Sequence, residues 1–433
     1  MESSLQPNKK FSSHKLLPIA ELWQQKISAL NGVREVSITG DLRRGLHSIE
    51  KAELVVAAEN TKSFISSIQM IQENFKMNQI SDDCLEISLE DGICLVIWIT
   101  EPQQFGNLLM YTTGSAGHIQ LLSHFLRSRN VRIEKNHIQI EGLSYSFDNE
   151  SDLYLALGLP YIPPELREGA GEIEAAARQS LPNLISQSDL KSDLHIHTRW
   201  TDGKASIDEI ITKAIQQKLS LIAITDHSPK LLKPRYFDSS YLLEQQKQID
   251  SLKKKTCNDL IILKGVEVDI LPDGSLDLPD WMLKKMDIVI ASLHLDLDLP
   301  KEVMTDRLVK AIQNPHVDII GHPGGRSLPS DDCTNLEWER VFRAAAQNHV
   351  ALEINSHKHH PFFDDEKIRQ AVQFGAMLTL NSDTHRLPMM ENSRFGISLA
   401  RRAGVSSNQV INTWEPQQLM QWLRNHRNGA TNN

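Results

Sequence analysis

Histidine and carboxylate residues recur through the second half of the chain at spacings that suit a metal centre. Two imidazoles, His195 and His197, stand two residues apart, so both point to one face of an extended strand. The same half carries further candidate ligands, which are Asp202, Asp226, His227, Glu267, Asp269, His294, His322, Asp383 and His385. Burying so many ionisable groups without compensating charge would cost several kcal/mol for each group. The pattern therefore predicts that divalent cations bind there.

The number and type of these residues indicate the chemistry. They exceed the four to six ligands that one ion takes, which predicts two or three divalent ions in one cleft. Imidazole and carboxylate ligands without thiolate suit manganese, zinc or iron, and the residues do not choose among these metals. Two ions about 3.5–4 Å apart can activate a water molecule and neutralise the leaving oxygen of a phosphoester. The predicted reaction is phosphoester hydrolysis without a covalent intermediate.

Parallel β-strands are the elements expected to position these side chains. Apolar, strand-like runs alternate with helical stretches after residue 191, at residues 221–225, 260–263, 288–292, 317–320, 350–354 and 377–380. One helix is expected to begin at Ser206, because Glu209 three residues later completes a capping box. This alternation predicts an α/β fold, either a barrel or a doubly wound sheet. Most of the candidate ligands follow the ends of these runs, where barrel enzymes place their active sites.

In the first half of the chain the apolar residues follow a different pattern. Apolar residues at helical spacing predict a helix over residues 16–30, and two apolar runs flank Asp91-Gly92, a strong signal for a hairpin. We expect a tail over residues 1–15, a mixed α+β domain over 16–101, a mainly helical domain over 102–186 and a short linker over 187–191. Near the C-terminus, residues 414–427 are expected to form an amphipathic helix that caps the barrel.

Composition limits the class of protein. The 433 residues suit two or three domains, and 40% hydrophobic and 23% charged residues are ordinary for a soluble protein. The longest strongly apolar run, Cys94–Ile99, is shorter than the roughly 20 residues that a membrane helix needs, and the N-terminus lacks the apolar core of a signal peptide. The cysteines form no CxxC pair, which favours a reducing compartment, so we expect a cytoplasmic protein without membrane contact.

The formal net charge of −9 counts against a protein that coats nucleic acid over a long stretch, because such proteins are usually basic. It does not exclude an enzyme that grips a strand end, since bound cations would reverse the charge of a carboxylate-rich site.

The second half resembles the PHP (polymerase and histidinol phosphatase) family. The resemblance covers residues 191–390 and is carried by His195-x-His197, Asp202, Asp226-His227, Gly265-Val266-Glu267, His294, Gly321-His322-Pro323 and Asp383-x-His385. It implies a distorted (β/α)7 barrel over residues 191–433 with a trinuclear metal centre. The nine ligand positions of the family correspond to His195, His197, Asp202, His227, Glu267, His294, His322, Asp383 and His385.

Other residues receive supporting roles from this resemblance. Asp226 is expected to orient a ligand imidazole, and Arg326 and Lys230 are candidates for holding phosphate, with a solvated surface charge as the alternative for each. A further histidine cluster, His357, His359 and His360, could contact metal or phosphate, but an exposed loop is the favoured interpretation.

The first half is similar to the palm and thumb of bacterial family X DNA polymerases, which commonly carry a PHP domain in this order. The similar segments are Gly40-Asp41-Leu42-Arg43-Arg44-Gly45, Tyr111-Thr112-Thr113-Gly114-Ser115 and residues 158–167. The positions that hold two Mg²⁺ ions through three aspartates in that family read Lys51, Glu53 and Cys94. Asp41 replaces the serine that touches the incoming triphosphate, and Thr112 replaces the steric-gate aromatic residue. We therefore predict a degenerate palm and no polymerase activity.

The leading hypothesis is a metal-dependent phosphodiesterase that acts on DNA, as a 3′–5′ exonuclease or in trimming 3′ ends and abasic sites during repair. The partner would then be single-stranded DNA or a 3′ end. A phosphatase for a small phosphoester, of the histidinol-phosphatase type, is the alternative. A second alternative is a non-catalytic DNA-end binding or assembly protein that keeps the metals for structure.

Overall fold

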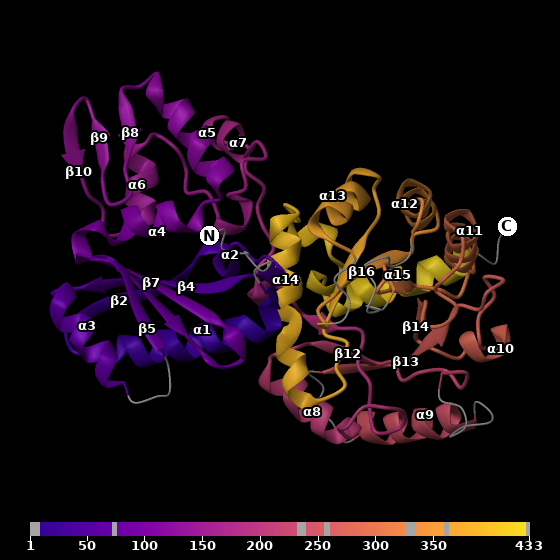
Figure 1. The fold of residues 1–433 in the computed structure, drawn as a ribbon. Helices are drawn as coiled ribbons and strands as arrows, with labels where there is room; N and C mark the ends of the chain where they lie inside the picture. The colour runs from indigo at the N-terminus through magenta and orange to yellow at the C-terminus, as the bar shows by residue number, and fades with distance from the viewer. Residues whose placement is uncertain are drawn as a thin grey trace. The chain divides into compact units, whose positions relative to one another are not determined.

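The structure, a computed structural model, describes residues 9–71, 76–231, 240–254, 260–325, 335–358 and 363–429. The chain forms two compact units, residues 1–182 and 183–433 (Figure 1). Among the described residues, no helix is both long enough and apolar enough to cross a membrane.

The second unit is a nearly closed parallel barrel. Within the described residues its strands follow one another in chain order, and each pairs in parallel with the next. They are β11 (Ser192–Asp193), β12 (Leu221–Ile224), β13 (Ile261–Asp269), β14 (Ile288–Ser292), β15 (Ile319–Gly321), β16 (Ala351–Asn355) and β17 (Leu378–Asn381). A parallel bridge between Ile196 and Thr384 joins the last strand to the first. This arrangement confirms the expected (β/α)7 barrel.

Helices surround the barrel, as alternating apolar periods predict. They are α8 (Ile207–Gln216), α9 (Ser240–Lys253), α10 (Asp280–Leu283), α11 (Lys301–Ile312), α12 (Trp338–Gln347), α13 (Asp365–Gln373), α14 (Ser393–Arg402) and α15 (Pro416–Gly429). The capping box of Ser206 and Glu209 begins α8, as expected. Leu419 and Leu423 of α15 pack into the same cluster as Leu194 of the first strand segment and Leu221 of β12. The C-terminal helix therefore closes one end of the barrel, as the sequence predicts.

The first unit contains a five-stranded sheet in the order β2-β4-β7-β6-β5. Its strands are β2 (Val33–Thr39), β4 (Lys51–Ala58), β5 (Lys76–Ser81), β6 (Cys84–Ser88) and β7 (Cys94–Thr100). Strands β6 and β7 form the expected hairpin, and Asp91 and Gly92 both have positive φ in its turn. Helices α1 (Ser13–Ser28) and α3 (Thr61–Met70) pack on one face, where the short helix α2 (Gly40–Arg43) adds Leu42, while α4 (Phe105–Thr113) lies on the other (Figure 1). The unit is thus α+β, as expected.

The bounds expected for the tail and for the linker differ from those of the structure. The tail was predicted to reach residue 15, but Phe11 is buried and pairs with Ile49 through strands β1 (Phe11–Ser12) and β3 (Ser48–Ile49). The residues after 102 are mainly helical, as expected, and they also contain β8 (Val131–Ile133), β9 (Ile138–Ile140) and β10 (Leu143–Tyr145), which form a small antiparallel sheet. Residues 183–190 belong to the barrel unit, since Ile185 packs in its core and donates its N–H to Val405.

A second core in the first unit carries a buried ion cluster. It is formed by α4 and by α5 (Ala116–Arg127), α6 (Glu150–Ala156) and α7 (Glu172–Ala177), with the small sheet. Glu150, at the start of α6, accepts hydrogen bonds from Arg43 at 2.6 and 3.0 Å and from Arg167, which is fully buried. Burial by itself would raise the pKa of Glu150, but Arg167 and Arg43 outweigh it and lower that pKa to about 2.

This shift makes a prediction for stability against pH. Because the folded-state pKa of Glu150 lies below its unfolded value, its contribution is full above about pH 4.5 and is lost as pH falls toward 2. A shift of this size corresponds to about 3 kcal/mol. Glu150→Gln should therefore be much less stable than the wild type in urea unfolding at pH 6, and this difference should shrink toward pH 2–3. Glu174→Gln, at an exposed position of α7, serves as the control. An equal difference at both pH values would contradict the assignment.

Candidate metal centre

The nine candidate ligands converge at one end of the barrel. Each lies on or after the C-terminal end of a strand segment: His195 and His197 after β11, His227 after β12, Glu267 on β13, His294 after β14, His322 after β15, and Asp383 and His385 after β17. Asp202 lies in the loop that joins β11 to α8. Because parallel strands all end at the same rim, residues nearly 200 positions apart in the sequence meet there. The strand register therefore builds the cluster.

Glu267 lies at the centre of the cluster. It is 1% exposed, and its carboxylate oxygens lie 2.9 Å from His227 Nδ1 and 3.0 Å from His322 Nε2. The same carboxylate is 3.3–3.4 Å from the ring nitrogens of His195, His197 and His294. A single buried carboxylate thus faces five imidazoles, and it would hold metal ions at the centre of the cluster.

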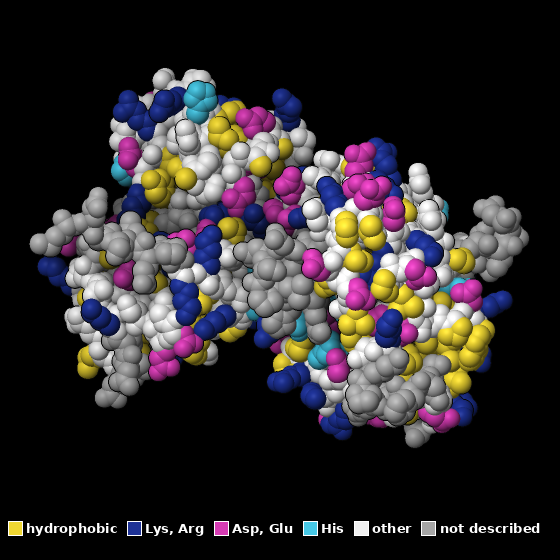
Figure 2. Space-filling view, turned by 45° about the vertical axis from the view of Figure 1, so that its right-hand side comes forward, with side chains coloured by type: hydrophobic (Ala, Val, Ile, Leu, Met, Phe, Trp, Pro, Cys, Tyr) yellow, Lys and Arg dark blue, Asp and Glu magenta, His cyan; other side chains and the backbone are white. Residues whose placement is uncertain are grey.

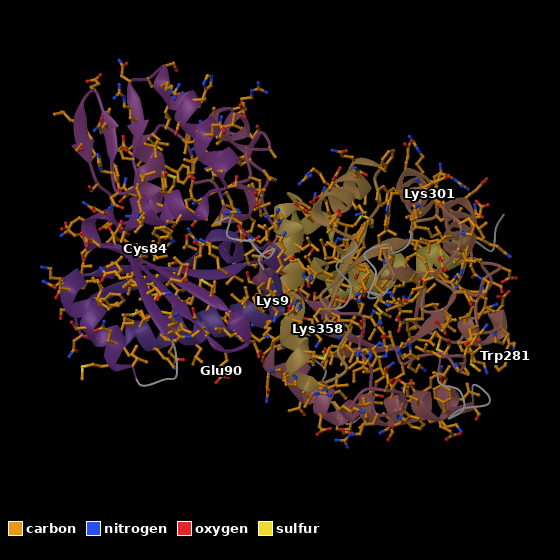
Figure 3. The ribbon with its side chains drawn as sticks, in the orientation of Figure 1. Lys9, Cys84, Glu90, Trp281, Lys301 and Lys358 are labelled. Carbon is orange, nitrogen blue, oxygen red and sulfur yellow. The ribbon has the colours of Figure 1, made fainter. Side chains whose placement is uncertain are left out.

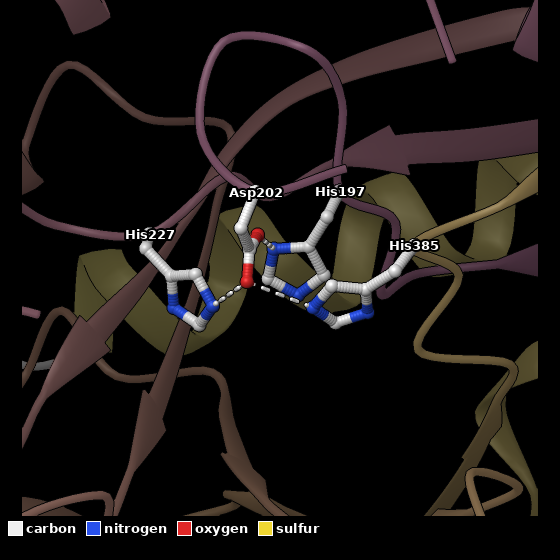
Figure 4. A group of neighbouring side chains, drawn as sticks. All are labelled: His197, Asp202, His227 and His385. Atoms are coloured by element: carbon white, nitrogen blue, oxygen red, sulfur yellow. Dashed lines mark hydrogen bonds and ion pairs between the residues drawn. The ribbon is translucent and has the colours of Figure 1, made fainter. Parts of the chain in front are cut away.

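Asp202 gathers the more exposed edge of the cluster (Figure 4). Its carboxylate lies 3.2 Å from His385 Nε2, 3.5 Å from His227 Nε2 and 3.6 Å from His197 Nδ1. The side chain of Asp202 is 40% exposed and that of His385 is 20% exposed, whereas those of His195 and His197 are fully buried. Substrate can therefore approach the cluster from the edge that Asp202 and His385 form.

The donor atoms fit divalent metal ions. Both ring nitrogens of His197 and the Nε2 atoms of His195 and His227 are buried and make no hydrogen bond within the described part of the chain. Ligand atoms gather within 4.8 Å of one another in three sets, which are His197, Asp202, His227 and His385; His195, His197 and Asp383; and His227, Glu267 and His294. Buried polar atoms without partners are costly. His322 lies outside these sets but contacts Glu267, so the donors suit more than one ion.

The charges of the cluster are strongly coupled. Burial opposes the charged form of His195, but Glu353 and Glu267 outweigh it and raise its pKa. Burial, with the neighbouring His227 and His385, lowers the pKa of His197 to about 4 and keeps this ring neutral. The imidazoles in turn hold the pKa of Glu267 well below its usual range, although burial would raise it. A neutral imidazole beside an ionised carboxylate is the state in which both bind metal.

Two carboxylates behind the ligands orient the imidazoles. Glu353, in the middle of β16, is fully buried and lies 2.8 Å from His195 Nδ1, while its second oxygen accepts from the N–H of His322. Asp269 lies 2.5 Å from Nδ1 of His294. Sequence reasoning gave Glu353 no role, although a charged residue inside the apolar run 350–354 was a visible signal. A carboxylate behind a ligand histidine fixes the ring and raises its basicity as a metal ligand.

Asp226 differs from its expected role. Its carboxylate accepts hydrogen bonds from Thr198, Thr201 and the side-chain amide of Gln245 on α9, and among the described residues no hydrogen bond joins it to an imidazole. All four side chains are at most 2% exposed. Asp226 therefore anchors the loop that carries Asp202 to helix α9 instead of orienting a ligand ring. Nothing in the sequence indicated that Gln245 supports the site, because its partner Asp226 lies 19 residues away in the chain.

The other candidates lie around the cluster. Lys230 donates its backbone N–H to Asp277 at 2.7 Å, and within the described residues its ammonium group makes no hydrogen bond or ion pair. Arg326, His359 and His360 lie outside the described residues. The ring of His357 lies 5.9 Å from that of His385. Lys358, the next residue in the chain, is labelled in Figure 3. His357 thus lies near the exposed edge of the cluster, where an exposed loop was the favoured interpretation.

The contact between Glu353 and His195 makes a testable prediction. Glu353→Gln keeps the size of the side chain but removes its charge, so we expect roughly a 10–100-fold loss of metal affinity. Mn²⁺ titration followed by electron paramagnetic resonance measures this directly. Glu366→Gln, at an exposed position of α13, is the matched control. Unchanged Mn²⁺ affinity in Glu353→Gln would show that Glu353 does not support the ligands.

Comparisons with known proteins agree with this site. Residues 193–357 match the PHP domain, and residues 108–168 match the DNA polymerase beta thumb. The "DNA polymerase/3′-5′ exonuclease PolX" of Bacillus subtilis is 31% identical over 416 residues, which are 95% of this chain and 72% of that protein. A probable phosphatase of Thermoanaerobacter sp. and another of Caldanaerobacter subterraneus are each 34% identical, over 51% and 54% of this chain and 89% and 91% of their own lengths.

The barrel and its histidine–carboxylate cluster define a metal-dependent phosphoesterase of the PHP class. The similarity to the Bacillus subtilis protein extends through both units of the chain. The chain therefore belongs to the PolX family, the family X polymerases that carry a C-terminal PHP domain.

Proposed function

We propose that this protein hydrolyses DNA from the 3′ end, as an exonuclease or 3′-end-trimming enzyme in repair, and does not polymerise DNA. One contrast within the chain carries the proposal. The nine candidate ligands of the barrel meet in one cluster that is exposed only at the Asp202–His385 edge, whereas two of the three palm positions that correspond to polymerase metal ligands form an internal ion pair. The Bacillus subtilis relative is named a DNA polymerase/3′-5′ exonuclease, which supports the DNA substrate.

The residues of the cluster divide the chemistry among them. Divalent ions, when bound, supply an activated water molecule and neutralise charge on the phosphoester. Glu267, Asp383 and the buried imidazoles would hold these ions inside the barrel. The Asp202–His385 edge, which is the more exposed, would receive the phosphate of the substrate. His357, beside His385, is placed to donate a hydrogen bond to that phosphate.

The surface favours local contact with a strand end. On the face that Figure 2 shows, the described lysine and arginine side chains are interspersed with aspartate and glutamate side chains in both units. A long duplex footprint needs a continuous basic surface, because affinity comes largely from neutralised phosphates. Binding of one 3′ end by metal ions and a few side chains does not need such a surface. The match of residues 108–168 to a polymerase thumb supports a DNA contact from the first unit.

The palm has lost the chemistry of a polymerase. Lys51 Nζ lies 2.9 Å from Glu53, and Trp98 donates to the same carboxylate at 3.2 Å. Cys94 is the strand partner of Lys51, and burial together with Glu86 raises the pKa of its thiol to about 11. A lysine, a paired carboxylate and a protonated thiol offer no site for a pair of Mg²⁺ ions.

In the palm, the position that is expected to contact an incoming nucleoside triphosphate is also taken up by ion pairs within the chain. Arg44 is 7% exposed, lies 2.5 Å from Asp41, and donates to Glu168 at 2.9 Å and to the carbonyl of Thr113 at 2.7 Å. Its charge is therefore neutralised by two carboxylates of the same chain. A nucleoside triphosphate would meet the negative charge of Asp41 instead of a free guanidinium.

Primer extension tests the loss of polymerase activity. With Mg²⁺ or Mn²⁺, a primed template and all four deoxynucleoside triphosphates, we expect no extended product. The assay should use Asp202→Ala, so that nuclease activity cannot remove new nucleotides, and the Bacillus subtilis relative as the positive control. Extension by even one nucleotide would contradict the proposed loss.

The nuclease is tested on single-stranded DNA labelled at its 3′ or 5′ end, with Mn²⁺ and with a small phosphomonoester in a parallel reaction. We expect a ladder that begins at the 3′ end and disappears in Asp202→Ala and His322→Ala. Asp208→Ala, at an exposed position of α8, should retain full activity. A DNA ladder that survives in both variants would indicate contamination and would refute the assignment.

A small-molecule phosphatase is the second candidate. The two probable phosphatases match little more than half of this chain, and one third of the aligned residues are identical. Hydrolysis of the phosphomonoester without any DNA ladder would favour this candidate. It would leave the first unit without a role in substrate binding.

A further inference from the structure

The barrel has a defect where its first and last strands meet. Backbone pairing between β11 and β17 is limited to the region of Thr384, which bridges to Ile196. In the residues that precede this bridge on each strand, side chains take the place of the backbone hydrogen bonds. Leu194 donates its N–H to the side chain of Asn381 at 3.0 Å, and Ser382 donates its N–H to the side chain of Asp193 at 3.2 Å. Strands that are bridged by side chains lie farther apart than strands in a regular ladder, which spaces them about 4.8 Å apart.

A pocket of about 560 Å³ opens at this defect, which we call the seam pocket. It lies within the barrel unit, between α8, α14 and the short helices η4 (Gln187–Asp189) and η5 (Leu387–Asn392). Its lining residues are Gln187, Ser188, Leu190, Ser192, Asp193, Gln217, Leu219, Leu380, Met390, Glu391, Ser393 and Arg394. A volume of this size suits a small molecule rather than a single ion.

The lining of the seam pocket is arranged in layers. Its most buried residues are Ser192, Asp193, Leu380 and Met390. Leu190 and Leu219 add apolar surface, while Gln217 and Ser393 add neutral hydrogen-bonding groups at intermediate depth. Binding sites for small molecules typically combine apolar walls with a few polar groups that fix orientation. The pocket therefore suits a flat, largely uncharged ring system with hydrogen-bonding edges.

One polar group at the bottom has no partner. The hydroxyl of Ser192 is buried and makes no hydrogen bond within the described residues. Its neighbour Asp193 lies 2.5 Å from the hydroxyl of Ser382. A buried hydroxyl without a partner costs free energy, which a hydrogen bond to a bound molecule would recover.

The charged side chains at the rim of the seam pocket indicate what a second part of its ligand would be. Arg394 is exposed at the rim, and the acidic rim residue Glu391 forms an ion pair of 2.5 Å with Lys213. The rim thus presents a guanidinium group, whose five N–H donors allow it to bind phosphate beside its contacts within the chain. A ring system joined to one phosphate is the structure of a nucleotide.

We propose that the seam pocket binds a deoxynucleoside 5′-monophosphate, with its base between the apolar walls and its phosphate toward Arg394. The choice of ligand rests on the proposed function, because a 3′–5′ exonuclease releases this class of product. The pocket is also linked to the candidate metal centre through few bonds, because Asp193 accepts hydrogen bonds from Ser382 and from the N–H of His195. His195 is itself a candidate ligand, and Ser382 directly precedes the candidate ligand Asp383. Product bound at the seam would therefore influence the strand ends that hold the metal ions.

Isothermal titration of the holoenzyme with deoxyadenosine, and then with its 5′-monophosphate, tests the proposal. We expect a saturable Kd in roughly the 0.1–1 mM range for ligands of this size. Leu219→Trp, which fills the pocket, and Gln217→Ala should each weaken both ligands about tenfold or more. Arg394→Gln should weaken the monophosphate alone. Ile215→Trp, at a half-exposed position of α8 outside the pocket, should bind like the wild type.

The outcomes separate this inference from the proposed function. If the nucleoside does not bind, or if Leu219→Trp and Gln217→Ala both bind it like the wild type, the seam pocket is not a nucleotide site, whether or not DNA is degraded. If both ligands bind as expected and no DNA ladder forms, the pocket stands and the exonuclease proposal fails. Circular dichroism of each variant confirms that the loss of binding is not a loss of fold.

Discussion

Replacing Glu267 with glutamine is expected to reduce phosphoester hydrolysis by roughly 10³-fold or more, a loss larger than removal of one stabilising donor usually causes. The reason is its place in the cluster, where one carboxylate faces the ring nitrogens of five histidines. An amide in its position would hold metal ions less tightly than a carboxylate, and it leaves the surrounding imidazoles without their central negative charge.

Hydrolysis of single-stranded DNA and of a small phosphomonoester, both with saturating Mn²⁺, measures this effect without assuming one substrate. Bound metal should be counted in the same samples by plasma emission spectroscopy, where we expect Glu267→Gln to retain less metal than the wild type. Glu302→Gln, at an exposed position of α11, provides the matched control. Activity within about tenfold of the wild type would exclude a central role for Glu267.

Removal of the divalent ions with a chelator is expected to lower the Tm of the barrel unit by about 10 °C. Ions that bind only the folded state at a thousand times their Kd add about 4 kcal/mol. For a unit of this size, each kcal/mol shifts the Tm by about 2–4 °C. The buried donor atoms of His195, His197 and His227 lose the partner that compensates their burial when the ions leave.

Differential scanning calorimetry before chelation, after chelation and after addition of Mn²⁺ measures this shift. Readdition should restore the original Tm in the wild type. Asp202→Ala, which lacks one ligand from the exposed edge of the cluster, should show a smaller shift. A chain that loses all bound metal and keeps its Tm would show that the cluster is stable without ions.

The regular parts of the fold were predictable because their signals are local. The period of apolar residues predicted the strands of the barrel, and the pair Ser206 and Glu209 predicted the start of α8. The hairpin at Asp91-Gly92 followed from the positive φ that these residues tolerate. Phe11 was missed because a two-residue strand has no period, and its burial depends on a partner at Ile49.

The candidate ligands were predictable from their types and spacing, while the residues that support them were not. Glu353 and Gln245 contact the site only because β16 and α9 pack beside it, 158 and 19 residues from His195 and Asp226. The role of Asp226 was wrong for the same reason, since a carboxylate next to a ligand histidine in sequence can still point to the opposite loop.

The sequence by itself indicated the class of the protein, the residue types of its candidate metal centre and the departures in its palm, because these depend on which side chains are present. Tertiary structure decided which carboxylate lies at the centre, which edge of the cluster is open and where the barrel wall leaves a pocket. Those properties depend on strand register and on the closure of the sheet between β11 and β17, which join residues far apart in the chain. Local propensity contains no information about such distant contacts, so only packing sets them.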